Sequence, residues 1–343
     1  MLVGKKMKAL ILAGGFGTRL GPLGEQMPKA AIVVDGDTVL GFILKKLAAE
    51  KIEPIILTNK RFQSFFRDQK NVLIEETMKD EEKPGAVSAI NNAIKQLKLN
   101  EDLLVVCADN YFSADLHGFV SSYMGEPLVG VYYVGKQPDM KPEEMATVKF
   151  EGSEGFPPPR ESFYITEFRE KVKPPLSDYV GVGMYILPKS VFPILDEFCK
   201  ERKRDAPGTF IEHLQSRGMK IKGYLFGGEW YDVSHKSYLR VFSGGRLVKS
   251  DERYIVCDLV MGNIVLSITI LHPGKQTTGH SHPAHEVYFF VEGEGEIELD
   301  GRRRRVKTKD LVSILPNEFH RVYNTSDKDL VFLSVFEKYG DRG

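Results

Sequence analysis

The segment from Leu12 to Leu20, Leu-Ala-Gly-Gly-Phe-Gly-Thr-Arg-Leu, constrains the fold of this chain more than any other. It continues from a short apolar strand predicted at Lys8–Leu12, and Pro28-Lys29 follows it on the same long loop. Glycines let backbone amides approach an anion because no Cβ stands in the way. Arg19 and Lys29 are ten residues apart, so they can contact a polyphosphate from two sides. The pattern predicts a phosphate-binding loop at the end of a strand.

Two common phosphate-binding loops do not fit this segment. A Walker loop requires Gly-x-x-x-x-Gly-Lys-Ser/Thr, and the sequence contains no such run. The Rossmann fingerprint requires a third glycine near Leu20 and a helix that begins at once. Pro22 and Pro28 instead keep the chain extended or turned until about Asp37.

Length and composition limit the class of protein. A chain of 343 residues is long enough for two domains. Its 47 basic residues equal its 47 acidic ones, which argues against nucleic acid or an anionic membrane as the main partner. No apolar run approaches the roughly 18 residues of a membrane span. Cys107, Cys199 and Cys257 form no Cys-x-x-Cys pair, which favours reduced thiols in a cytoplasmic protein.

Strands and helices alternate along the first part of the chain. Apolar residues at helical spacing predict helices at Thr38–Lys51 and Gly85–Lys98, and apolar runs predict strands at Pro54–Thr58 and Leu103–Ala108. This alternation is typical of an α/β protein with a parallel sheet. Ligands of such sheets bind beyond the carboxyl ends of the strands, which is where the glycine-rich segment and Asp109 fall.

The pattern changes after Ser243-Gly244-Gly245, the best candidate for a linker. Short alternating strands follow, with a hairpin predicted at Glu296–Val306 around Asp300-Gly301. We therefore predict an α/β domain over residues 1–243 and an all-β domain over residues 244–343.

The glycine-rich segment with Pro28-Lys29 resembles the signature of sugar-1-phosphate nucleotidylyltransferases, the nucleoside-diphosphate-sugar pyrophosphorylases. The resemblance implies a Rossmann-like domain with a mixed, mostly parallel sheet. It also implies transfer of a nucleotidyl group from a nucleoside triphosphate to a sugar 1-phosphate, with release of pyrophosphate. Arg19 would hold the β- and γ-phosphates, and Lys29 would neutralise the α-phosphate and the attacking phosphate. The nucleotide-binding residues implied are Leu12, Ala13, Gly14, Gly15, Gly17, Thr18 and Gly85.

Two aspartates resemble the Mg²⁺ ligands of that family. Asp109, in Cys-Ala-Asp-Asn, corresponds to the family's Gly-Asp, and Asp232, in Trp-Tyr-Asp-Val-Ser, corresponds to Trp-x-Asp-Val-Gly. Ala108 and Ser234 replace the glycines of the two patterns. Two carboxylates with phosphate oxygens and water suit Mg²⁺. On local sequence alone, Asp109 also fits a turn-forming residue.

The sugar side of the resemblance departs from the family pattern. Glu170-Lys171 resembles a Glu-Lys-Pro element whose glutamate binds sugar hydroxyls and whose lysine binds the sugar phosphate, but Val172-Lys173 precedes Pro174 here. Val180 and Gly181 lie on the strand that resembles the sugar-side strand. A salt-bridged surface pair is the alternative interpretation of Glu170-Lys171. The altered spacing also leaves open a non-sugar acceptor, such as inositol or choline phosphate.

The second domain contains histidines at the spacing of a metal site. From Gly274 the chain follows Gly-x5-His-x-His-x3-Glu-x6-Gly, which resembles the first cupin motif and contains His280, His282 and Glu286. The second motif is partly met and contains His320. Residues i and i+2 of a strand face the same side, so both histidines of the first motif are expected to point into a jelly-roll barrel. The set suits Fe²⁺, Mn²⁺, Ni²⁺ or Zn²⁺, and a metal-free barrel is the alternative.

The cupin resemblance leaves its role open between a sugar-phosphate isomerase and a metal-stabilised assembly module. It also implies that pairing of subunits as a homodimer is possible. A non-catalytic regulator that binds a sugar nucleotide remains an alternative for the whole chain. The nucleotide base, the sugar and the cupin metal are not predicted by the sequence.

Overall fold

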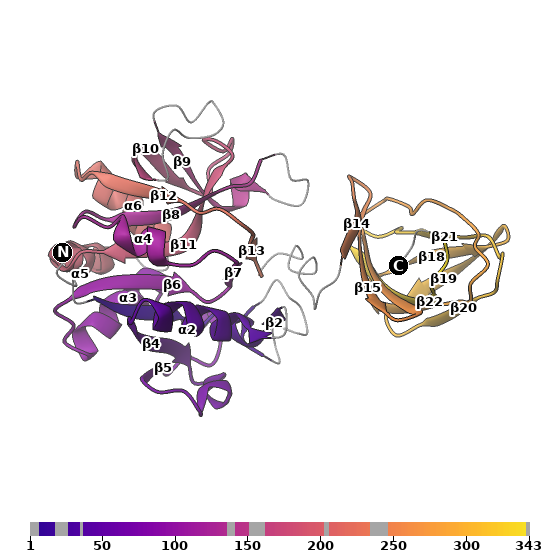
Figure 1. Ribbon diagram of the computed structural model, residues 1–343, viewed down its shortest axis with the longest axis horizontal. Helices are drawn as coiled ribbons and strands as arrows, with labels where there is room; N and C mark the ends of the chain where they lie inside the picture. Colours follow the sequence, from indigo (N-terminus) through magenta and orange to yellow (C-terminus); the bar gives the residue numbers. More distant parts are fainter. Residues whose placement is uncertain are drawn as a thin grey trace. The chain divides into compact units, whose positions relative to one another are not determined.

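The computed structural model describes residues 7–17, 27–34, 37–135, 141–150, 162–201, 206–233 and 246–340. The chain divides into two compact units, Met1–Tyr238 and Leu239–Gly343 (Figure 1). The boundary predicted after residue 243 lies outside the described residues. None of the helices in the described segments has the length and apolar content that crossing a membrane requires. The three cysteines, all of them described, form no disulfide.

A nine-stranded sheet forms the framework of the first unit. Its strands are β1 (Met7–Leu12), β4 (Glu53–Asn59), β5 (Val72–Glu75), β6 (Asp102–Cys107), β8 (Leu128–Tyr133), β9 (Ala146–Phe150), β10 (Ser162–Glu170), β11 (Tyr179–Leu187) and β12 (Ile221–Leu225). They lie in the order β5-β4-β1-β6-β11-β8-β12-β10-β9. Strands β5, β4, β1 and β6 are parallel, as are β8 and β12, and the remaining pairs are antiparallel.

Helices cover this sheet. They are α2 (Val39–Ala49), α3 (Ala86–Gln96), α4 (His117–Ser121), α5 (Phe192–Glu201) and α6 (Pro207–Ser216), with single 3₁₀ turns η2 (Lys29–Ala31), η3 (Gln63–Phe66), η4 (Asp80–Glu82), η5 (Pro142–Glu144) and η6 (Lys189–Val191). Helices α3, α5 and α6 pack with the sheet in one apolar core. The buried residues of α2, such as Ile43 and Leu47, lie outside that core. Buried strand residues Ile11 and Leu104 also lie outside it, because alternate residues of a strand face opposite sides. The predicted mixed α/β class is confirmed.

A short two-stranded ribbon joins distant parts of the first unit. Strand β7 (Asn110–Phe112) pairs antiparallel with β13 (Trp230–Asp232), with Asp232 opposite Asn110. The Val233 amide donates to the Asp109 carbonyl at 2.8 Å. The ribbon therefore places Asp232 next to Asp109. A second small ribbon pairs β2 (Val33–Val34) with β3 (Asp37–Thr38).

The second unit is all β. A six-stranded sheet has the order β14-β15-β16-β22-β17-β20, and a three-stranded sheet has the order β19-β18-β21. The strands are β14 (Arg246–Ser250), β15 (Tyr254–Met261), β16 (Ile264–Leu271), β17 (Glu286–Glu292), β18 (Glu294–Leu299), β19 (Arg302–Lys307), β20 (Leu311–Ile314), β21 (His320–Tyr323) and β22 (Leu330–Glu337). Both sheets contribute to one apolar core, with Phe290 and Phe332 from the larger sheet and Ile297 from the smaller.

The predicted hairpin is confirmed between β18 and β19, which pair antiparallel. Asp300 and Gly301, with φ of 45° and 78°, form its turn. Positive φ at both central residues matches the twist of the flanking strands, which is why Asp-Gly is favoured there.

Candidate active site and metal centre

A cleft of about 610 Å³ opens in the first unit, at the edge where the parallel strands end. It is lined by Glu75 from β5, Leu12 from β1 and Cys107 from β6, together with residues from the loops that follow these strands. This is the position where open α/β sheets bind ligands. The predicted site residues that line it are Leu12, Gly14, Gly15, Gly17, Lys29, Gly85, Asp109, Glu170, Lys171, Gly181 and Asp232.

Four other predicted residues do not line the cleft or are not described. Ala13 is buried, and its amide donates to the Leu57 carbonyl at 2.8 Å. Val180 is fully buried in strand β11. Thr18 and Arg19 lie outside the described residues, so their phosphate contacts remain predictions.

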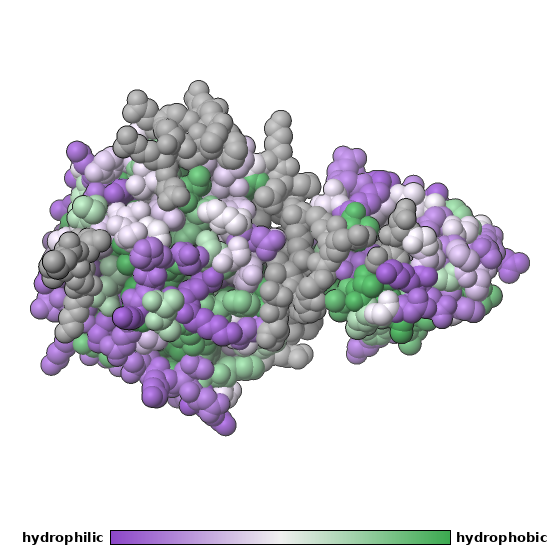
Figure 2. Space-filling model, viewed as in Figure 1, coloured by the Kyte–Doolittle hydropathy of each residue, from purple (hydrophilic) through white to green (hydrophobic). Residues whose placement is uncertain are grey.

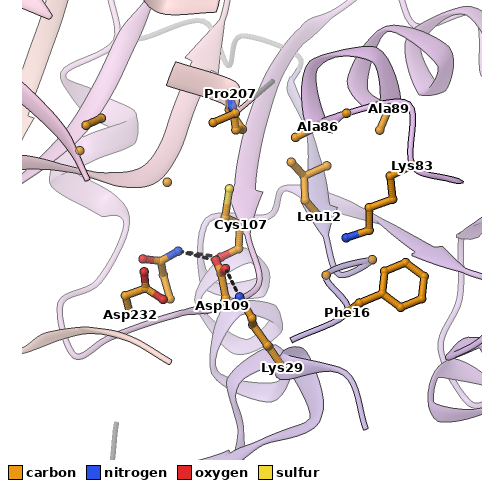
Figure 3. Close-up of a pocket in the computed structure, with 18 of the residues that line it drawn as sticks. Leu12, Phe16, Lys29, Lys83, Ala86, Ala89, Cys107, Asp109, Pro207 and Asp232 are labelled. Atoms are coloured by element: carbon orange, nitrogen blue, oxygen red, sulfur yellow. Dashed lines mark hydrogen bonds and ion pairs between the residues drawn. The ribbon is translucent and has the colours of Figure 1, made fainter. Parts of the chain in front are cut away.

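Asp109 and Asp232 lie together at one end of the cleft. Asp109 follows β6, and Asn110 Nδ2 donates to Asp109 Oδ1 at 2.8 Å. The Trp230 indole donates to Asn110 Oδ1 at 3.0 Å, so the ribbon of β7 and β13 orients the first carboxylate. Figure 3 shows Asp232 and Lys29 flanking Asp109. The sequence motif contained Trp230 and Asn110 but did not predict this positioning role.

Lys29 reaches the same point from the turn η2. Its Nζ lies 3.1 Å from Asp109 Oδ2, and the two side chains are 15% and 31% exposed. The cation and the carboxylate come from segments 80 residues apart. An ion pair this accessible to water is only weakly stabilising. It therefore leaves both groups available to exchange partners when a charged ligand enters.

The pKa of the Cys107 thiol shows that negative charge prevails at this end of the cleft. Burial raises its pKa well above the ordinary value, and the carboxylates of Asp109, Asp232 and Glu170 raise the pKa further, while Lys29 opposes them. Three acidic groups thus act on one buried point. Such a concentration of negative charge next to oxygen donors fits a divalent cation such as Mg²⁺.

Glu170 lies at the opposite side of the cleft from the glycine-rich segment. Burial raises the pKa of its carboxyl, Lys171 lowers it, and Glu212 raises it. The Lys171 Nζ is 3.9 Å from Glu170 Oε1, and the Glu170 amide donates to Glu212 Oε1 at 2.7 Å. The structure therefore places Glu170, whose side chain is 13% exposed, beside Lys171, whose side chain is 50% exposed, at the cleft.

Four charged residues that line the cleft were not predicted, namely Glu75, Asp80, Lys83 and Glu144. Glu75 ends β5, and Lys83 precedes α3. Lys83 Nζ lies 4.6 Å from the centre of the Phe16 ring, and Figure 3 shows both at the other wall from Asp232. Glu75 could have been predicted from its position at the end of a short apolar run, but no strand was predicted between residues 58 and 103.

The predicted histidines of the second unit converge. One ring nitrogen from each of His280, His282 and His320 lies within 4.8 Å of the others. His280 and His320 also exchange backbone hydrogen bonds of 3.0 and 3.2 Å, which fixes their separation. Glu286 Oε2 lies 2.9 Å from His282 Nε2 and 3.4 Å from His320 Nε2. His285 is exposed.

The polar atoms of this cluster fit a bound metal ion. His280 Nδ1 lies 3.2 Å from the Thr278 carbonyl and His320 Nδ1 lies 3.1 Å from the Glu318 carbonyl, which favours the tautomers with Nε2 unprotonated. Burial lowers the pKa of His320 and so also favours the neutral ring that binds metals. Two buried nitrogens, His282 Nδ1 and His320 Nε2, have no hydrogen-bond partner within the described residues. A cation would remove part of that cost.

Family models match both units. Residues 8–244 match the model of the nucleotidyl transferase family, and residues 267–336 match that of the cupin domain. The first match covers more than half of the chain. The chain belongs to the nucleotidyl transferase family. The resemblance of the glycine-rich segment and of the histidine motif to these two families is thus confirmed.

Individual proteins resemble parts of this nucleotidyl transferase. A bifunctional sugar-1-phosphate nucleotidylyltransferase/acetyltransferase of Sulfurisphaera tokodaii is 24% identical over 66% of this chain and 52% of its own length. A 5-nitrosalicylic acid 1,2-dioxygenase of a Bradyrhizobium species is 28% identical over 121 residues, 32% of this chain and 58% of that protein. The inositol-1-phosphate CTP transferase from T. maritima superimposes with a TM-score of 0.54 at 16% identity, over 68% of this chain and 91% of that one.

The match spans only part of many relatives. The first curated relatives are matched over 62%, 51% and 64% of their length. The T. maritima structure supports the fold of the first unit alone.

Proposed function

We propose that the first unit transfers a nucleotidyl group from a nucleoside triphosphate to a sugar 1-phosphate. The observation that carries this proposal is the cleft in which Lys29 Nζ lies 3.1 Å from Asp109 Oδ2, next to Asp232. An oxygen of the acceptor phosphate forms a bond to the α-phosphorus, and the bond from that phosphorus to the β-phosphate oxygen breaks. Pyrophosphate leaves with the electron pair of the broken bond.

Asp109 and Asp232 would hold Mg²⁺, which when bound neutralises phosphate charge and orients the triphosphate. Lys29 stabilises charge on the α-phosphate and on the incoming phosphate as the two approach. Arg19 is proposed to hold the β- and γ-phosphates. Phosphoryl transfer requires mainly positioning and charge stabilisation, so no nucleophilic side chain is needed.

The acceptor is proposed to bind on the side of Glu170 and Lys171. The carboxylate accepts hydrogen bonds from hydroxyl groups, and the lysine contacts the acceptor phosphate. Gly181, which lines the cleft, and Val180, buried beside it, shape the wall of this subsite. The sugar-1-phosphate activity named for the Sulfurisphaera relative supports a sugar acceptor.

The test is pyrophosphate release from a matrix of nucleoside triphosphates against hexose 1-phosphates, inositol 1-phosphate and choline phosphate, with Mg²⁺. Release that requires one hexose 1-phosphate supports the proposal. Release only with inositol 1-phosphate or choline phosphate would mean that the acceptor is not a sugar 1-phosphate. An inositol acceptor would agree with the activity named for the T. maritima neighbour. Nucleotide binding without release under any pair would instead support a regulator.

For the second unit we propose a bound transition metal and a role in assembly. His280, His282, Glu286 and His320 would bind Fe²⁺, Mn²⁺, Ni²⁺ or Zn²⁺, which when bound polarises an oxygen ligand. The boundary with the first unit is proposed to lie after residue 243.

An exposed apolar sheet face supports pairing of two copies through the second unit. Its members lie on five neighbouring strands: Met261, Ile264, Val335, Val287, Phe289, Val291 and Leu311, each 37–66% exposed. Register places Val287 opposite Val335, and Phe289 opposite Leu311, on one face. Figure 2 shows hydrophobic residues gathered on this unit. Apolar patches that span several strands mark interaction surfaces, and a second copy presents the same patch across a two-fold axis.

Sedimentation of the full chain tests the pairing. We expect a homodimer that the Phe289→Asp, Leu311→Asp double variant converts to a monomer. Met124→Asp, at a 64% exposed residue of the first unit, is the control and stays dimeric. A wild-type monomer would contradict the assembly role, and isomerisation of a hexose phosphate that disappears on chelation would favour the isomerase.

A further inference from the structure

Glu75 is a carboxylate in the cleft that the proposed transfer does not use. It ends the edge strand β5, and it lines the cleft. Burial raises the pKa of its carboxyl, and Lys83 opposes this effect. The side chain makes no hydrogen bond or ion pair with any residue in the described segments. Lys83 itself forms an ion pair with Asp80 at 3.1 Å, so the carboxylate of Glu75 is left to face the cleft.

The order of strands places Glu75 far from the proposed metal carboxylates. From β6, which precedes Asp109, the sheet continues through β1 and β4 to β5. Neighbouring strands lie about 4.8 Å apart, so β5 lies about 14 Å from β6. The acceptor residue Glu170 lies in the other direction along the sheet, on β10. If the α-phosphate binds at Lys29, as the proposed function requires, the nucleoside extends toward Glu75.

The wall between these points suits a flat ring. Gly14, Gly85, Ala86 and Ala89 line it with little or no side chain. A Cβ added to Gly14 would lie 3.8 Å from Glu75 Oε2. Because Gly14 has no side chain, a ring can lie over the backbone there and reach the Glu75 carboxylate. Gly85 has a φ of 102°, which favours glycine at the start of α3. An aromatic base therefore fits here, with one edge against Glu75.

A carboxylate accepts hydrogen bonds with two oxygens and repels other acceptors. Guanine offers two adjacent donors on one edge, the N1–H and the 2-amino group. Uracil and thymine offer one N–H between two carbonyl oxygens. Adenine and cytosine offer an amino group next to an unprotonated ring nitrogen. We infer that Glu75 accepts both donors of guanine and that the first unit uses GTP.

Matched variants test this inference in the full chain. Glu75→Gln keeps the shape but replaces one accepting oxygen with an amide that donates. Glu76→Gln is the control, because that side chain is 79% exposed and pairs with Lys60. Equilibrium binding of GTP is compared with that of inosine triphosphate, which lacks the 2-amino group. Both are measured by calorimetry with Mg²⁺, and turnover is followed as pyrophosphate release.

We expect the wild type to bind GTP about tenfold or more tightly than inosine triphosphate, as expected for one hydrogen bond to a charged acceptor. Glu75→Gln should lose about 10–100-fold in GTP affinity and most of this preference. Glu76→Gln should behave as the wild type. The wild-type preference needs no variant, so it tests the inference even if Glu75→Gln is unstable.

The experiment gives different results if guanine recognition is wrong and if the proposed nucleotidyl transfer is wrong. Equal binding of GTP and inosine triphosphate, or a preference for another nucleotide that Glu75→Gln leaves unchanged, would overturn guanine recognition while transfer stands. A Glu75-dependent preference for GTP without turnover on any acceptor would overturn transfer while guanine recognition stands.

Discussion

Each unit contains a cluster of ionisable side chains, and the two clusters differ in how far water reaches them. In the cleft of the first unit, Lys29 and Asp109 are 15% and 31% exposed and come from distant segments. In the second unit, the side chains of His282, Glu286 and His320 are 3%, 5% and 1% exposed. The first cluster is open to water and exchanges its ion-pair partners at low cost. Three members of the second are shielded from water, where unpaired polar atoms are costly, and His280 is the member that is not buried. The difference separates a site for passing substrates from a site for a resident ion.

The backbone reinforces this contrast. Reciprocal backbone hydrogen bonds join His280 to His320, so the spacing of these rings is set before any ion binds. The carboxylate pair of the first unit depends instead on the ribbon of β7 and β13 and on side-chain contacts. The following predictions test whether each cluster behaves as its surroundings require.

The largest effect is expected at Lys29. Lys29→Met should lower kcat by about 10²–10³-fold, the cost of losing one preorganised electrostatic group. The change in nucleotide affinity should be smaller, because the charge acts mainly in the transition state. Lys45→Met is the control, since Lys45 is 73% exposed and pairs with Asp37 on the surface. If kcat of Lys29→Met were within threefold of the wild-type value, Lys29 would not be a catalytic residue.

The second effect concerns the resident ion. His320→Ala should weaken metal binding by at least about 100-fold, because even loss of an outer partner costs 10–100-fold. Removal of the metal should lower the stability of the second unit by up to about 4 kcal/mol at a thousandfold excess over Kd. Metal content after dialysis and calorimetry of the full chain measure both. His285→Ala, at an exposed position, should retain the metal.

Two outcomes would contradict the contrast between the units. If His320→Ala retained a stoichiometric metal ion, the cluster would not be its binding site. If it lost the metal and abolished nucleotidyl transfer as well, the two sites would not be independent.

Local chemistry made much of both sites predictable. The glycine-rich segment and Lys29, and the spacing of His280, His282 and Glu286, lie within short stretches where residue type and spacing restrict the chemistry. The two helices predicted at Thr38–Lys51 and Gly85–Lys98 begin and end within two residues of α2 and α3. Thr38 accepts from the Gly41 amide at 2.9 Å at the start of α2.

Features that depend on distant contacts were not predictable. Strand β11 lies antiparallel between β6 and β8, and no local pattern specifies that order. Glu75 was missed because β5 is only four residues long and because Glu75 begins a run rich in charged residues that resembles an exposed loop. The buried ring nitrogens without a hydrogen-bond partner in the described residues, His282 Nδ1 and His320 Nε2, could not be predicted because they depend on how the two cupin motifs pack in the fold.

A third effect is the pH dependence of GTP binding. Burial raises the pKa of Glu75, so the carboxylate is ionised only above this raised value. As pH falls through it, the wild type should lose GTP affinity until it approaches that of Glu75→Gln, a change of about tenfold or more. The ratio of the two dissociation constants, measured from pH 8 to pH 5, removes the titration of the triphosphate. A constant ratio would show that Glu75 does not bind the base as an anion.

The smallest effect is on stability. The raised pKa means that the folded state disfavours ionised Glu75 relative to the unfolded state. This penalty is fully present above the raised pKa and is lost as the pH falls from that value toward the ordinary pKa of a glutamate. Glu75→Gln should therefore stabilise the first unit at pH 8 by no more than about 1 kcal/mol, after allowance for solvent screening. The gain should shrink at pH 5. Denaturant unfolding at both pH values measures it, and destabilisation at pH 8 would contradict this account.

The ribbon of β7 and β13 also sets an order of events during biosynthesis. Trp230 lies 120 residues after Asn110, its hydrogen-bond partner. At 5–20 residues per second, a ribosome needs about 6–24 s to make the intervening chain. Through that interval the nascent unit carries Asp109 without Asp232, and strand β7, which is buried in the folded unit, without its partner. The unit therefore completes its fold and gains Asp232, its second proposed magnesium ligand, in the same final step of synthesis.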